Sequence, residues 1–174
     1  SRITAGPWLA GVLSRLRSPG TDRASLPGKS LEATLRPYQE DGVRWLVFLN
    51  ELGLGACLAD DMGLGKTIQV LSLLLVLKAR GTPSRPHLIV VPASLLGNWR
   101  SAAARFAPAL RLRLAHASGD GVEAAVAEDA DIVVTTYGTL AKTEWIRAAA
   151  WDTVVLDEAQ AIKNPGARQT RAVK

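Results

Sequence analysis

Residues 58–67 read LADDMGLGKT, an apolar segment that runs into a glycine-bearing loop and closes on Lys66 and Thr67. Glycines let backbone N–H groups turn inward around phosphate oxygens, Lys66 brings a positive charge to the β- and γ-phosphates, and the Thr67 hydroxyl suits Mg²⁺. The residues that follow are apolar at helical spacing, which aims the positive end of a helix at the same anion. The stretch therefore predicts a phosphate-binding loop (P-loop) between a strand and a helix, although Asp60 replaces the first glycine of the general template.

A pair of carboxylates further along the chain supplies a second motif. The aliphatic residues 154–156 predict a strand buried on both faces, and Asp157 and Glu158 follow it directly. Charges in that position need a partner. Mg²⁺ bound to ATP is one such partner, with Asp157 holding the metal and Glu158 orienting and deprotonating the attacking water. Alone, the pair fits an acidic helix start equally well; together with the loop it favours an ATP-hydrolysing site.

Composition narrows the class of protein. Apolar residues make up 48% of the 174 residues, and no run approaches the roughly 18 to 20 apolar residues of a membrane span. The single cysteine, Cys57, provides no disulfide framework, which indicates a reducing, cytoplasmic compartment, with nucleoid association if the source is bacterial or archaeal. A formal charge of +5 favours polyanionic partners. Solvated surface arginines explain it equally well: Arg100, Arg105, Arg111 and Arg113.

Strand and helix patterns alternate along most of the chain. Residues 1–34 predict an amino-terminal helix and a turn-rich linker, and a further helix starts at Pro37 and ends near residues 50–53. Strands are then expected at 56–59, 87–91, 110–114, 131–134 and 153–156, with helices at 66–80, 95–106 and 120–128. This order predicts an α/β domain whose mainly parallel sheet is covered by helices on both faces. Ligands of such sheets gather at the carboxyl ends of the strands, where both motifs lie.

The order of short motifs resembles that of the Swi/Snf-type ATPases of helicase superfamily two, in the bacterial and archaeal branch. The residues that carry this resemblance are LRPYQ at 35–39, DDMGLGKT at 60–67, VPASLLGNW at 91–99, TTYG at 135–138, DEAQ at 157–160 and IKN at 162–164. Asp60 matches the loop of this family. The resemblance implies a RecA-like P-loop fold for residues 35–174, incomplete at its carboxyl-terminal end.

The family also assigns roles to individual residues. The resemblance implies that Gln39 recognises the adenine edge, which a side-chain amide suits because it donates and accepts at once. Without it, a helix-surface glutamine would be the preferred interpretation. The catalytic residues are expected to be Glu158 and Lys66, and the metal ligands Thr67 and Asp157. The nucleotide-binding residues are expected to be Arg36, Tyr38, Gln39, Asp61, Met62, Gly63, Leu64, Gly65, Lys66 and Thr67.

A further set of positions corresponds to the DNA-backbone segments of the family. These are Pro92, Ser94, Asn98, Thr135, Thr136, Tyr137 and Lys163. Hydroxyls and helix amino termini bind phosphates well, although Ser94 fits a plain helix cap too. Trp99 fits the core better than a stacking platform, since a base inside an intact duplex offers no face. Lys163 fits either a nucleic-acid contact or the end of a turn before Pro165.

The resemblance further implies parts that lie beyond Lys174. In the family, another strand and a second RecA-like domain follow the acid box, and the second domain brings arginines to the γ-phosphate. Such arginines contribute about 10³ to 10⁵ in rate, so the chain alone is expected to be nearly inactive and to need that second domain as its partner. An open sheet edge also predicts self-association of the chain.

We therefore expect the ATP-binding half of a DNA-dependent ATPase that translocates on duplex DNA, as chromatin-remodelling motors do, with ATP and Mg²⁺ as cofactors. Two alternatives remain open. One is a strand-separating DNA or RNA helicase. The other is a nucleotide-regulated binding module with little turnover.

Overall fold

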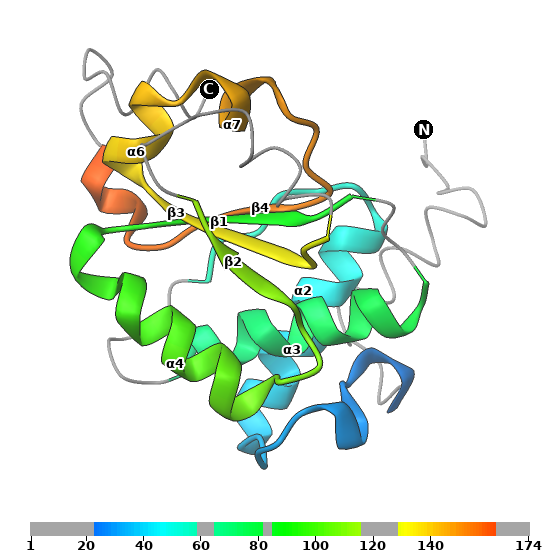
Figure 1. Ribbon diagram of the computed structural model, residues 1–174. Coiled ribbons are helices and arrows are strands. Elements are labelled where there is room, and N and C mark those ends of the chain that lie inside the picture. Colours follow the sequence, from blue (N-terminus) through cyan, green and yellow to red (C-terminus); the bar gives the residue numbers. More distant parts are fainter. Residues whose placement is uncertain (1–22, 59–64, 82–84, 116–128, 163–174) are drawn as a thin grey trace, which may run out of the picture. The chain divides into compact units, whose positions relative to one another are not determined.

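A computed structural model describes residues 23–58, 65–81, 85–115 and 129–162 (Figure 1). The chain forms two compact units, Ser1–Val76 and Leu77–Lys174, which are described separately. The predicted helix at 120–128 lies outside the described residues, and so do residues 1–22, where the amino-terminal helix is predicted. The boundary after residue 34 stays a prediction. No helix of the described residues is long and apolar enough to cross a membrane.

Helix α2 (Pro37–Glu51) is the main element of the first unit, after the 3-10 turns η1 (Arg23–Ser25) and η2 (Gly28–Ser30). Pro37 suits the first helical position because it has no N–H to satisfy, and Arg36 N donates to Gln39 Oε1 across 2.9 Å in a capping box. Val43 and Val47 recur at helical spacing and are fully buried. Helix α3 (Lys66–Ala79) then starts directly after Gly65, as the sequence predicts.

The strand expected at 56–59 is wrong for the residues that the structure describes. Residues 56–58 have no strand conformation, and Cys57 is exposed instead of lying in a buried strand. Small side chains here offer little apolar area to bury, and Gly53 and Gly55 precede them. A strand also needs a hydrogen-bonded neighbour, and no described strand pairs with this segment.

The second unit contains a four-stranded, fully parallel sheet in the order β2-β3-β1-β4. Its strands are β1 (His87–Val91), β2 (Leu112–Leu114), β3 (Ile132–Thr136) and β4 (Val154–Leu156). β1 is buried throughout, as a central strand covered on both faces must be. β4 pairs with β1 at one end of this order, and its Val154 is 50% exposed, so the prediction that residues 154–156 are buried on both faces is wrong.

Helices cover both faces of this sheet (Figure 1). Helix α4 (Leu96–Phe106) follows β1 through the turn η3 (Ala93–Leu95) and lies on one face; helices α6 (Tyr137–Lys142) and α7 (Glu144–Ala148) lie on the other. The core on the α6 and α7 side consists of Leu88, Val90, Ala115, Ala130, Val133, Tyr137, Leu140 and Ile146. The α/β class and the parallel, doubly covered sheet predicted from the sequence are thereby confirmed.

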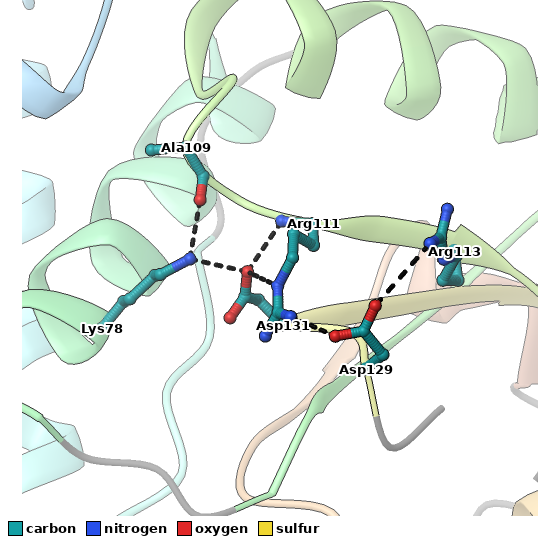
Figure 2. A network of polar contacts seen from close by, with 6 residues as sticks. All are labelled: Lys78, Ala109, Arg111, Arg113, Asp129 and Asp131. Carbon is teal, nitrogen blue, oxygen red and sulfur yellow. Dashed lines mark hydrogen bonds and ion pairs between the residues drawn. The ribbon is translucent and has the colours of Figure 1, made fainter. Parts of the chain in front are cut away.

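A network of charges ties together the amino ends of β2 and β3 (Figure 2). Asp131 Oδ2 accepts from Lys78 Nζ at 2.7 Å, from Arg111 N at 2.7 Å and from Arg111 Nε at 3.3 Å. Lys78 also donates to the Ala109 carbonyl at 2.7 Å, and Arg111 pairs with Asp129. Burial works to raise the pKa of Asp131, but the hydrogen bonds from Lys78 and Arg111 outweigh it and lower that pKa. Arg111 therefore has a structural role here.

Candidate nucleotide site

The predicted phosphate loop belongs to the first unit and is described from Gly65 onward. Gly65 has a φ of 82°, in the left-handed region that favours glycine, and a Cβ added there would collide with Gln39 Nε2. Glycine is therefore required at the point where the loop enters α3. Lys66 and Thr67 occupy the first turn of that helix and are half-buried, next to backbone N–H groups that have no carbonyl partner within the helix.

Three predicted nucleotide-binding residues surround the start of α2. Gln39 is 8% exposed, with its Oε1 bound to Arg36 N and its Nε2 beside Gly65. Arg36 and Tyr38 are exposed. The side chain of Gln39 thus lies against the end of the phosphate loop within the same unit. Its role in binding the nucleotide stays a prediction. The remaining predicted members lie outside the described residues: Asp61, Met62, Gly63 and Leu64.

The acid pair lies at the carboxyl end of β4, in the second unit. Asp157 N donates to the Val90 carbonyl at 2.9 Å, which continues the β4–β1 ladder by one residue and anchors the acid to the sheet. Asp157 Oδ1 accepts from Glu158 N at 3.0 Å. Glu158 has a φ of 50°, a left-handed conformation that costs free energy in a residue with a side chain, and such strain concentrates at functional sites. Its carboxylate accepts from Gln160 Nε2.

Two aromatic side chains hold Asp157 from separate elements. Trp99 Nε1 of α4 donates to Asp157 Oδ2 at 2.8 Å, and the Tyr137 hydroxyl donates to the Asp157 carbonyl oxygen at 2.8 Å. Burial, followed by the charges of Asp157 and Glu158, raises the pKa of Tyr137 to about 12, so its hydroxyl stays protonated. Trp99 is 3% exposed, which confirms its expected place in the core. The sequence missed the polar contact of its indole, although a buried Trp N–H usually finds a partner.

The residues predicted to contact DNA fall into two environments. Ser94 and Asn98 are exposed after the carboxyl end of β1, with Pro92 half-buried before them. Ser94 does not cap α4: the residue at that cap is Leu95, and no side chain bonds there, so the plain-cap alternative is wrong.

The other predicted contacts lie at the end of β3 or beyond the described residues. Thr135 is fully buried, and Thr136 Oγ1 accepts from Thr139 N at 3.0 Å as the cap of α6. Tyr137 is buried against Asp157. Lys163 lies outside the described residues. The exposed members, Ser94 and Asn98, are therefore the ones that the described surface offers to a ligand, and the DNA role of the whole set stays a prediction.

The donors predicted for a metal fit Mg²⁺. Each carboxylate oxygen of Asp157 accepts one described hydrogen bond, and a carboxylate oxygen has room for another contact. Mg²⁺ is usually held by one or two carboxylates together with substrate phosphates and water, so a dedicated protein cage is not required. No cluster of three or more His, Cys, Asp or Glu side chains suited to a metal occurs among the described residues. The assignment of Asp157 and Thr67 remains a prediction.

Comparisons with known proteins agree with one another. The SNF2-related domain family matches residues 38–174. The chain is 49% identical over 150 residues to YwqA of Bacillus subtilis, a protein named for ATP-dependent helicase or translocase activity. This match covers 83% of the present chain and 16% of YwqA. It is 39% identical over 166 residues to the TATA-binding protein-associated factor MOT1 of Saccharomyces cerevisiae, covering 83% of this chain and 8% of that one.

Among solved structures, the chain resembles the SWI2/SNF2 ATPase core of Sulfolobus solfataricus in complex with double-stranded DNA. The TM-score is 0.76 at 41% identity, and the match covers 83% of this chain and 30% of that one. The SWI2/SNF2 ATPase core domain of Sulfolobus solfataricus gives a TM-score of 0.74 at 41% identity, over 83% of this chain and 29% of that one. The chain thus spans less than a third of each of these proteins.

Proposed function

Since the chain belongs to the SNF2-related domain family, we propose that it is the ATP-binding half of a DNA-dependent ATPase that translocates on duplex DNA. The observation that carries the proposal is that the chain holds two devices, one in each unit. Lys66 and Thr67 open a helix directly after a left-handed glycine, and Asp157 and Glu158 follow a strand at the carboxyl edge of a parallel sheet. The two together match the needs of phosphoryl transfer to water.

Each residue has a distinct task in this proposal. Lys66 binds the β- and γ-phosphates, and the backbone N–H groups at the start of α3 share their charge. Asp157 and Thr67 would hold Mg²⁺, which would neutralise charge on the phosphates. Glu158 accepts a proton from the attacking water at its carboxylate, and Gln39 contacts the adenine edge. Hydrolysis by the whole motor further requires the second RecA-like domain that the resemblance implies.

The proposed nucleic-acid partner is the backbone of duplex DNA. Support comes from the exposed Ser94 and Asn98 beyond β1 and from the duplex named with the similar Sulfolobus structure. Backbone contacts carry no sequence information, so binding should be independent of sequence and should weaken steeply with salt. A motor acting on DNA would work in the cytoplasm, at the nucleoid in a bacterial or archaeal cell.

The test is ATP turnover by a longer protein, one that joins this chain to the proposed second RecA-like domain. Turnover is measured with duplex DNA, single-stranded DNA or RNA, at several salt concentrations. Duplex DNA should stimulate turnover most. Ser94→Ala combined with Asn98→Ala should lower the apparent affinity for duplex by about tenfold, the loss of one or two phosphate hydrogen bonds. Ser101→Ala, an exposed serine further along α4, is the matched control. Stronger stimulation by single strands would favour a strand-separating helicase, and ATP binding without turnover would favour a regulated binding module.

A further inference from the structure

Asp157 is the point at which two helices of the second unit converge. Trp99 reaches it from α4 and binds its carboxylate, whereas Tyr137 reaches it from the start of α6 and binds its backbone carbonyl. The helices lie on opposite faces of the sheet (Figure 1). Both side chains are almost fully buried, at 3% and 4% exposure, so water does not compete freely for either hydrogen bond.

The acceptor that Trp99 uses differs in charge from the acceptor of a second tryptophan. Trp151, a half-buried residue of the same unit, donates its Nε1 to the main-chain carbonyl of Ile146 at 2.8 Å, a neutral acceptor. Trp99 instead binds a carboxylate, at the same 2.8 Å, and a hydrogen bond to a charged acceptor is stronger and more directional. With Glu158 N on the other oxygen, this contact fixes the orientation of the Asp157 carboxylate.

Each aromatic donor is also adjacent to a residue proposed to contact DNA. Asn98 is exposed and precedes Trp99 in α4, and Thr136 caps α6 directly before Tyr137. A helix is stiff over one turn, so a displacement of either helix start moves the neighbouring aromatic side chain together with its hydrogen bond. The two segments that the sequence predicts to contact DNA therefore have short connections to the same carboxylate residue.

We propose that Trp99 and Tyr137 are positioning residues that hold Asp157 ready for the metal–nucleotide complex, and that they transmit DNA binding at α4 and α6 to the rate of ATP hydrolysis. The inference rests on the proposed function. Trp99 sets the direction of the carboxylate, and Tyr137 sets the backbone position from which that carboxylate projects.

The matched variants are Trp99→Phe and Trp151→Phe. Each replaces a tryptophan of the second unit by a smaller aromatic ring and removes one indole hydrogen bond, but only the first of these bonds ends on Asp157. Equal melting temperatures of the two variants would show that they are structurally equivalent. Tyr137→Phe removes the second bond while keeping the ring.

Two quantities are measured on the longer protein: the affinity for a fluorescent ATP analogue with and without Mg²⁺, and the ratio of turnover with and without duplex DNA. Trp99→Phe should reduce the gain in affinity that Mg²⁺ gives by about tenfold and leave metal-free binding unchanged, the loss expected for one hydrogen bond to a charged group. It should lower the DNA stimulation ratio as well. Tyr137→Phe should act in the same direction, more weakly because its acceptor is a neutral carbonyl.

The outcomes separate the two proposals. If the wild-type protein is stimulated by duplex DNA and Trp99→Phe behaves like Trp151→Phe in both quantities, the inference is wrong and the proposed function stands. If Trp99→Phe weakens binding equally with and without Mg²⁺, the indole is structural and the inference is again wrong. If the wild-type protein neither binds ATP nor responds to DNA, the proposed function fails and the inference fails with it.

Discussion

The two ends of the parallel sheet differ in the partners of their acidic side chains. At the amino end, Asp131 lies against Lys78 and Arg111, so that each charge has an opposite charge beside it. At the carboxyl end, Asp157 and Glu158 accept hydrogen bonds only from neutral groups of the described residues, and Glu158 has a left-handed backbone. The amino end is complete as a structure, whereas the carboxyl end keeps negative charge for a cationic ligand.

The largest predicted effect separates a ligand-binding charge from a structural one, and it compares the two lysines of α3. Lys66→Ala should weaken ATP binding by roughly a hundredfold, because it removes a charge-assisted contact to the phosphates. Lys78→Ala, near the other end of the same helix, should lower thermal stability with no comparable change in ATP affinity. Calorimetric titration with ATP and thermal melts of both variants check this. Equal losses of ATP affinity in the two variants would show that Lys66 has no special role in binding the nucleotide.

The next effect concerns the amino-end network. Asp131→Ala should lower the free energy of unfolding by about 2 kcal/mol, because it leaves Arg111 N without its acceptor and removes the carboxylate partner of Lys78. The lowered pKa of Asp131 sets the sign with pH: its contribution is present above the unfolded value of about 3.9 and is lost as the pH falls toward the folded value. Urea unfolding of wild type and variant between pH 7 and pH 3 measures both. A difference that does not shrink in acid would contradict the ion-pair assignment.

A smaller effect is expected from His87, which is buried at the start of β1 with its Nδ1 3.6 Å from Asp152 Oδ2. Burial lowers the pKa of His87, and the charges of Asp152 and Asp131 oppose this only in part. As the pH falls below the unfolded value of about 6.5, the unfolded chain binds a proton first, so stability should decrease toward pH 5.

The variants that test this effect are His87→Gln and Asp152→Asn. His87→Gln should flatten the dependence of unfolding free energy on pH between 7 and 5. Asp152→Asn should steepen it, because it removes the charge that favours protonated His87. Chemical unfolding at three pH values in that range distinguishes them, and identical slopes in wild type and His87→Gln would refute the assignment.

The sequence predicted the elements whose residues carry their own signal. The strands predicted at 87–91 and 131–134 contain continuous apolar runs and appear as β1 and β3. The helices from Pro37 and Lys66 begin where a proline and a glycine-bearing loop indicate. The predicted strand at 56–59 is wrong over residues 56–58, because a short run of small residues becomes a strand only if a neighbouring strand pairs with it. Pairing is a property of the tertiary structure.

Within the site, residue types were predictable and their contacts were not. Asp157 and Glu158 stand out in the sequence because paired acids follow an apolar run. The hydrogen bond between Trp99 and Asp157 joins positions far apart in the chain, so only the packing of α4 beside the end of β4 reveals it. The left-handed conformation of Glu158 has no sequence signal at all, since glutamate rarely adopts it.

The central claim of the proposed function is that Glu158 acts as the base in ATP hydrolysis. The most direct measurement compares ATP affinity and duplex-stimulated turnover in the longer protein for wild type and Glu158→Gln. The substitution keeps the size of the side chain and removes its basicity, so ATP should bind as tightly as before while turnover falls by about a thousandfold or more. Turnover at the wild-type rate in Glu158→Gln would contradict the account.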